Sequence, residues 1–270
     1  MCQACAEGGR RCRDRRQLEG LAVDELRPRQ SDDRPDVFWP DEPAPAVLWD
    51  RYPSAIAGEA VATVLEACAE ESSITSDHLA VIPAGVRMHA LEFRVKSPSS
   101  LARKIHARLR RDRVVVGEST ARDVSVRLTD VVRYTALCGD HEDIPRVAQS
   151  TVAALEARGY RVVEVEHSYV DDNPYKGLHL LVASPTGRVF ELQIQSELSQ
   201  KVKDELHVDY ELERDMDASW EVRAAARARM ERLSSSVATP AGLVEMTHLG
   251  GVEVRMKAYP NPYGGVGGHC

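Results

Sequence analysis

The chain contains 270 residues, 43% of them hydrophobic, and carries a formal net charge of −7. This length and composition can supply the buried core of one substantial domain with appendages, or of two small domains. The acidic balance excludes a uniformly basic surface for nucleic acid. No run of about eighteen apolar residues occurs, and the N-terminal MCQACAEGGRRCRDRR lacks the apolar centre of a signal peptide, so we expect no membrane span and a cytoplasmic protein.

The N-terminal segment, residues 1–45, is rich in Arg, Asp, Gly and Pro and shows no sustained apolar period, which predicts an irregular leader. Cys2, Cys5 and Cys12 offer three thiolates in this segment, one fewer than a structural zinc site uses. A zinc site completed by a distant His269 or Cys270 is one interpretation. A reduced, flexible tail is the other.

A helix, a short strand and a second helix are predicted after the leader. Apolar residues at helical spacing indicate a helix over 55–71, and the alternation in MHALEFRV indicates a strand over 88–95. Ser97 followed by Pro98 is typical of an N-cap and a first helical turn. The helix that begins there has one apolar face, formed by Leu101, Ile105 and Leu109.

The segment 94–113 is strongly cationic and contains a single acid, Asp112. Arg94 and Lys96 are expected to end the strand, with Lys104 farther along the helix. A junction of this kind directs cations and free backbone N–H groups towards one spot, which suits a polyphosphate. A solvated helix face is the alternative interpretation of the charges.

The rest of the chain alternates between strand and helix patterns. Strands are predicted over 131–137 and 161–170, and a hairpin around a Pro-Thr-Gly turn; helices are predicted over 144–160, 197–216 and 219–236. This order indicates an α/β (α+β) fold with a mixed β-sheet flanked by helices. The C-terminal extension 236–270 is expected to be a mobile tail, because it ends in a Gly- and Pro-rich stretch.

Two carboxylates are candidates for chemistry. Asp130 precedes a predicted buried strand and Glu191 lies inside one, and a lone buried carboxylate needs a cation, hydrogen bonds or a metal as partner. Asp130 could form an ordinary ion pair with Arg127 or Arg133, and Glu191 could lie on the polar side of its strand. Together with the cationic junction and a Tyr-x-x-x-His before the hairpin, they suggest Mg²⁺-assisted phosphoryl chemistry.

Four motifs resemble the RelA/SpoT-like synthetase domain in order and approximate spacing, over roughly residues 50–215. They are RVKSPSSLARK at 94–104, DVVRYTAL at 130–137, YKGLHL at 175–180 and ELQIQ at 191–195. The resemblance implies a five-stranded mixed sheet of the nucleotidyltransferase type in a domain spanning 46–235. It also implies a stand-alone small alarmone synthetase, a GTP diphosphokinase-type transferase that moves the β,γ-diphosphate of ATP to the ribose 3′-hydroxyl of GDP or GTP.

The resemblance assigns a role to each motif residue. Arg94, Lys96, Ser100, Lys104 and Arg133 would bind ATP. Asp130 would hold Mg²⁺, and Glu191 would complete the metal site or act as base towards the 3′-hydroxyl. The acceptor would be bound by Tyr175, which stacks on its base, and by Lys176, His179 and Gln193.

The acceptor side departs from the family pattern. Gly177 stands where Ser or Ala is usual, and Gln195 stands where a basic residue is usual. A toxic synthetase that modifies an adenine nucleotide or the 3′-end of tRNA is therefore an alternative, and a non-catalytic nucleotide-sensing module is a second one. The sequence leaves open an antitoxin partner and a homo-oligomer.

Overall fold

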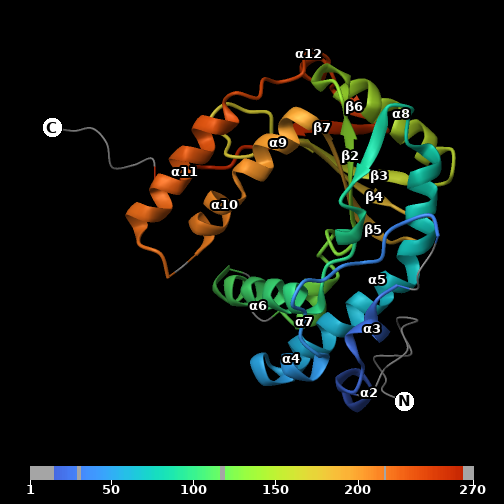
Figure 1. Cartoon of the computed structure of the whole chain (residues 1–270), viewed down its shortest axis with the longest axis vertical. Helices are drawn as coiled ribbons and strands as arrows, with labels where there is room; N and C mark the ends of the chain where they lie inside the picture. Colours follow the sequence, from blue (N-terminus) through green and yellow to red (C-terminus); the bar gives the residue numbers. More distant parts are fainter. Residues whose placement is uncertain (1–14, 29–31, 116–118, 216, 264–270) are drawn as a thin grey trace. The chain divides into compact units, whose positions relative to one another are not determined.

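The computed structural model describes residues 15–28, 32–115, 119–215 and 217–263 (Figure 1). Two compact units divide the chain. Unit 1 comprises 1–76 and 90–133, and unit 2 comprises 77–89 and 134–270. Within the described parts of the chain, no helix is both long and apolar enough to cross a membrane.

Unit 1 is helical. Its longest helices are the first part of α5 (Ser54–Val81) and α6 (Pro98–Val115), and the shorter ones are α2 (Arg15–Glu19), α3 (Val23–Leu26), α4 (Pro45–Arg51), η1 (Leu91–Phe93) and α7 (Ala121–Ser125). The predicted start of α6 is confirmed, since Ser97 Oγ accepts a hydrogen bond from Ser100 N at 3.3 Å. Leu101 and Ile105 of α6 are fully buried, as its apolar face predicts.

Part of the predicted irregular leader belongs to the core of unit 1. Val37 and Trp39 are 2% and 4% exposed, and Trp39 Nε1 donates to the carbonyl of Val95 at 2.8 Å. Phe38 N also donates to Glu92 O at 2.7 Å. Residues 35–39 lack regular secondary structure but are fixed by burial and hydrogen bonds, and the helices α2 and α3 lie earlier in the same leader. The leader is therefore not irregular throughout, which a composition rich in Pro and Asp did not reveal.

The strand predicted over 88–95 is shorter than expected. Strand β1 spans Val86–His89, and Ala90 then adopts a left-handed φ of 52° before the turn η1. A positive φ cannot continue a strand. The cationic residues 94–96 follow this turn and do not end a strand.

Unit 2 contains a seven-stranded mixed sheet in the order β1-β2-β5-β4-β3-β7-β6. Its strands are β1, β2 (Arg133–Cys138), β3 (Arg161–His167), β4 (Leu178–Ala183), β5 (Val189–Ser196), β6 (His248–Leu249) and β7 (Val252–Met256). The mixed sheet flanked by helices is as predicted, but the expected number of five strands is wrong. The additional strands are β6 and β7, which lie in the region expected to be a mobile tail.

The two faces of the sheet differ in polarity, because side chains alternate along each strand. In β5, Phe190, Leu192 and Ile194 are fully buried, whereas Glu191 and Gln193 on the other face are partly exposed. Helix α8 (Ile144–Glu156) buries its apolar residues and contacts β3 and β5. One face therefore forms the core, and the other is available to carry polar groups.

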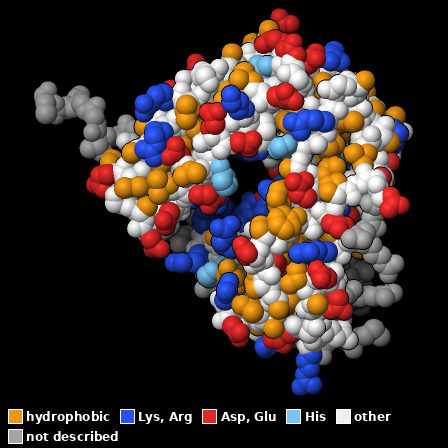
Figure 2. Space-filling model, viewed as in Figure 1, with side chains coloured by type: hydrophobic (Ala, Val, Ile, Leu, Met, Phe, Trp, Pro, Cys, Tyr) orange, Lys and Arg blue, Asp and Glu red, His pale blue; other side chains and the backbone are white. Residues whose placement is uncertain are grey.

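The remaining helices of unit 2 are α9 (Glu197–Glu205), α10 (His207–Arg214), α11 (Trp220–Ser234) and α12 (Ala241–Val244), with the turn η2 (His141–Asp143) before α8. Helices α10 and α11 lie side by side (Figure 1). On the face of the protein drawn in Figure 2, acidic and basic side chains are intermixed. That face is therefore not uniformly basic.

Candidate functional site

The first set of candidate residues lies in unit 1, at the junction that precedes α6. Residues 94–96 run antiparallel to 131–133, with Lys96 N donating to Val131 O at 2.9 Å and Arg133 N donating to Arg94 O at 2.8 Å. This pairing places Lys96 beside Asp130. Helix α6 then brings Lys104 to the same carboxylate, although the two lysines are eight positions apart in the sequence.

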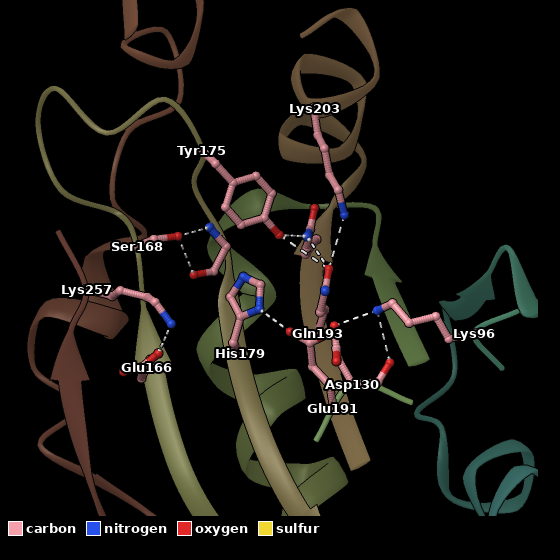
Figure 3. Close-up of polar contacts among 12 residues, drawn as sticks. Lys96, Asp130, Glu166, Ser168, Tyr175, His179, Glu191, Gln193, Lys203 and Lys257 are labelled. Carbon is pink, nitrogen blue, oxygen red and sulfur yellow. Dashed lines mark hydrogen bonds and ion pairs between the residues drawn. The ribbon is translucent and has the colours of Figure 1, made fainter. Parts of the chain in front are cut away.

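Asp130 is clamped between the two ammonium groups. Its Oδ2 accepts from Lys96 Nζ at 2.6 Å (Figure 3). The same oxygen accepts from Lys104 Nζ. Burial opposes the charged form, but Lys96 and Lys104 outweigh it and hold the pKa of Asp130 well below its usual range. Burial also lowers the pKa of Lys96, with the charges of Lys104 and Arg133 acting in the same direction. Two cations with one carboxylate leave a net positive cluster.

The other oxygen of Asp130 provides a test of whether a metal ion fits. Oδ1 is buried and has no hydrogen-bond partner among the described residues. A buried carboxylate oxygen without a partner is costly, and it is the hard ligand that Mg²⁺ takes. No group of three or more His, Cys, Asp or Glu capable of holding a metal occurs in the described ranges. Mg²⁺ fits this set, because it commonly uses one or two carboxylates, with waters and substrate phosphates as its other ligands.

Arg94 does not join this cluster. Its guanidinium is 2% exposed and forms a buried ion pair with Glu71, at 2.6 Å between Nε and Oε2. It also donates to the carbonyls of Pro35 and Leu91 at 2.8 and 2.9 Å. The structure therefore gives Arg94 a role in holding the leader and α5 together, and leaves it no solvent-facing donor for ATP.

The remaining candidates of unit 1 lie close to the junction. Arg133 is exposed and donates from Nε to Phe93 O at 3.4 Å, so the predicted pair with Asp130 is not formed. Ser100 lies in the first turn of α6. That turn already binds a carboxylate, since Glu42 accepts from Ser99 N at 2.8 Å and from Ser99 Oγ at 2.5 Å. The start of α6 thus has the affinity for anions that its free N–H groups predict.

The second set of candidates lies on the polar face of the unit 2 sheet. His179 of β4 is directly opposite Gln193 of β5 on one side and Glu166 of β3 on the other. Its Nδ1 lies 3.0 Å from Glu191 Oε1, so the ring donates to the carboxylate (Figure 3). That bond places the remaining lone pair on Nε2, which is buried and has no partner among the described residues.

Tyr175 approaches this face from the loop before β4. Its hydroxyl accepts from Gln195 Nε2 at 2.5 Å and donates to Gln193 Oε1 at 3.3 Å. Lys203 of α9 lies over the ring, 5.3 Å from its centroid, and donates to Gln193 Oε1 at 3.1 Å. Burial raises the pKa of the Tyr175 hydroxyl well above its usual value, with the charge of Glu191 acting in the same direction. The tyrosine is therefore neutral at physiological pH.

Gly177 lies close against these polar groups, with no room for a side chain unless they move. A Cβ added at this position would lie 2.9 Å from Tyr175 Oη, 3.1 Å from His179 Nε2 and 3.3 Å from Gln195 Nε2. Three polar atoms therefore converge where a side chain is missing. The two residues at which the sequence departs from the family pattern, Gly177 and Gln195, both lie at this crowded point.

Not every predicted acceptor residue lies there. Lys176 is 7% exposed, and its ammonium donates to Val237 O at 2.8 Å, so it ties the loop to the segment that follows α11. Lys203 was missed by the sequence analysis because it lies outside the four motifs. In the sequence, only its position shortly after ELQIQ could have indicated that Lys203 belongs to the site.

The predicted zinc ligands Cys2, Cys5 and Cys12 lie outside the described residues, as do His269 and Cys270. Of the cysteines that are described, Cys68 is half-buried and Cys138 is buried. Burial raises the pKa of the Cys138 thiol to about 11. Cys138 is therefore a thiol of the core and not a reactive thiolate.

No protein-family model matches the chain, and no curated protein matches it. Among solved structures, it is similar to the small alarmone synthetase 1 of Bacillus subtilis bound to pppGpp, with 20% identity, 70% of this chain and 90% of that chain covered, and a TM-score of 0.36. It is also similar to the Type VI effector Tas1 in complex with its immunity protein, with 18% identity, 67% and 94% covered, and a TM-score of 0.39. A GTP pyrophosphokinase family protein from Streptococcus pneumoniae has 14% identity, 73% and 92% covered, and a TM-score of 0.37.

Proposed function

We propose that the protein is a Mg²⁺-dependent pyrophosphotransferase that moves the β,γ-diphosphate of ATP to the ribose 3′-hydroxyl of GDP or GTP. The observation that carries the proposal is Asp130, whose Oδ2 is held by Lys96 and Lys104 while its buried Oδ1 has no partner among the described residues. Two ammonium groups can bind phosphate oxygens, and a carboxylate oxygen without a hydrogen-bond partner can bind a hard metal ion such as Mg²⁺.

The donor is assigned to unit 1. Lys96 and Lys104 would each bind phosphate oxygens of ATP and offset negative charge on the transferred group. The start of α6, which binds the Glu42 carboxylate, provides further N–H donors near Ser100. Mg²⁺ would be held by Asp130 and, when bound, would neutralise charge on the triphosphate.

The acceptor is assigned to unit 2. Tyr175 would stack on its base, and Gln193 and Lys203 would hold polar groups of the nucleotide. Glu191 is the base of the proposal: it takes the proton of the 3′-hydroxyl as the oxygen attacks the β-phosphorus of ATP. The bond between the β-phosphorus and the oxygen bridging to the α-phosphate breaks, and AMP leaves with the electron pair. The hydrogen bond from His179 orients the Glu191 carboxylate for this step.

A second candidate keeps the chemistry and changes the acceptor to the 3′-end of tRNA. It is favoured by the exposed arginines of α6, since phosphate contacts from Arg dominate affinity for RNA. They are Arg103, Arg110 and Arg111. In this case an antitoxin partner is expected, as for a toxic synthetase.

A transfer assay with γ-labelled ATP, Mg²⁺ and, separately, GDP, GTP, ADP and deacylated tRNA tests both candidates. We expect label in the guanosine product, and Asp130→Asn and Glu191→Gln should each reduce transfer by roughly a hundredfold or more. The matched controls are Asp50→Asn and Glu211→Gln, which change exposed acids and should leave the rate unchanged. Label in tRNA alone would support the second candidate. Transfer to none of the four acceptors would refute both.

A further inference from the structure

The C-terminal strand β7 adds a cation to the polar face of the unit 2 sheet. It pairs in parallel with β3, with Arg255 opposite Glu166. Beyond β7 the chain continues in the same direction, since Lys257 N donates to His167 O at 2.8 Å. The Lys257 ammonium forms an ion pair with Glu166, which lies directly opposite His179. Figure 3 shows Lys257 and Glu166 on the β3 side of His179, and Gln193 on the β5 side.

The segment after β7 is held to the loop that carries Tyr175. Asn173, which is 2% exposed, donates to the carbonyls of Lys257 and Ser168 at 2.7 and 2.9 Å. Its Oδ1 accepts from Tyr259 N at 2.8 Å. Arg227 of α11 donates to the carbonyl of Tyr259. Because a buried Asn makes two hydrogen bonds between the two segments, the position of Lys257 is set by the loop of the acceptor side.

Lys257 has unused capacity to bind an anion. Its side chain is 42% exposed, and its ammonium has three N–H donors, of which Glu166 is the one acceptor among the described residues. Burial opposes its charge, but the hydrogen bond that Lys257 donates to Glu166 and the negative charges around it together outweigh burial and raise the pKa of Lys257 above its usual value. The group is therefore charged at physiological pH.

The same face carries several carboxylates, among them Glu164, Glu166 and Glu191, so an anionic acceptor needs cations to be bound there. Lys203 provides one on the α9 side and Lys257 provides one on the β7 side. We propose that Lys257 binds the 5′-phosphate groups of the acceptor nucleotide and so selects nucleoside diphosphates and triphosphates over nucleosides. The proposal rests on the proposed function for the identity of the ligand as a nucleotide.

The test is a calorimetric titration of the full chain with GDP and ADP and with the nucleosides guanosine and adenosine. We expect Lys257→Met to weaken diphosphate binding roughly tenfold, the effect of losing one charge-assisted hydrogen bond, and to leave nucleoside binding unchanged. The matched control is Lys201→Met, which removes the same charge from an exposed position of α9. It should bind all four ligands as the wild type does.

Three results would overturn the proposal: unchanged diphosphate binding by Lys257→Met, an equal loss for nucleosides and diphosphates, or no diphosphate binding by the wild type. The transfer assay separates this proposal from the function. If the wild type binds GDP but transfers no label, and Lys257→Met weakens GDP binding, the Lys257 contact is supported and pyrophosphotransfer is refuted.

Discussion

The buried ion pair between Glu71 and Arg94 allows a sharp test of whether Arg94 is structural. The two side chains are 1% and 2% exposed, and Glu71 also accepts from Thr75 Oγ1 at 2.8 Å. Glu71→Ala would leave the guanidinium buried without its counter-charge. Removing one partner of a buried pair costs about 3–5 kcal/mol, so we expect a loss of that size in the free energy of unfolding.

Urea unfolding followed by circular dichroism measures this loss as a shift of the midpoint at constant slope. Glu205→Ala removes an exposed glutamate at the end of α9 and serves as the control, with an expected change within about 0.5 kcal/mol. Replacing both members of the pair by Met should recover part of the stability lost in Glu71→Ala, because no lone charge is then buried. A Glu71→Ala protein within about 1 kcal/mol of the wild type would refute the structural role and return Arg94 to the ATP-binding residues.

Three further predictions follow from the site. Because the folded-state pKa of Asp130 is depressed, its contribution to stability is present above the unfolded pKa of about 3.9 and is lost as the pH falls below that value. The difference in the free energy of unfolding between wild type and Asp130→Asn should therefore shrink from pH 6 to pH 3 in urea titrations. A difference that grew over this range would contradict the ion pairs of Asp130 with the two lysines. Gly177→Ala would place a methyl group 2.9 Å from Tyr175 Oη and displace it, so in steady-state assays we expect a higher acceptor KM and an unchanged ATP KM. A raised ATP KM alone would argue against an acceptor role for Tyr175. Lys203→Met removes the cation over the Tyr175 ring and should raise the acceptor KM roughly two- to fivefold, whereas an unchanged KM would exclude that contact.

The alternation of strand and helix patterns sufficed to predict the mixed sheet, because its strands are bounded by clear turns and its faces differ in polarity. The C-terminal strands were missed. The Gly- and Pro-rich end of the chain suggested a tail, although Gly250-Gly251 between His248-Leu249 and Val252 is a hairpin signal. Both glycines adopt positive φ, of 55° and 72°, as such a turn requires.

The candidate site was predictable where the motifs name its residues. The structure brings Lys96, Lys104 and Asp130 together, and it joins Tyr175, His179 and Glu191 through one sheet face. Their assignment to ATP and to the acceptor stays a prediction. The burial of Arg94 depends on Glu71, which is 23 residues away in the sequence, and no local pattern shows such a pairing.

The central claim is transfer of the diphosphate as a unit, and the most direct test is to identify what remains of ATP. Wild-type protein, ATP, Mg²⁺ and GDP would be incubated and the nucleotides separated and weighed by mass spectrometry. The account predicts that AMP forms in the same amount as an acceptor nucleotide that has gained two phosphate groups. Asp130→Asn should form neither product. ADP together with an acceptor that has gained one phosphate group would contradict it.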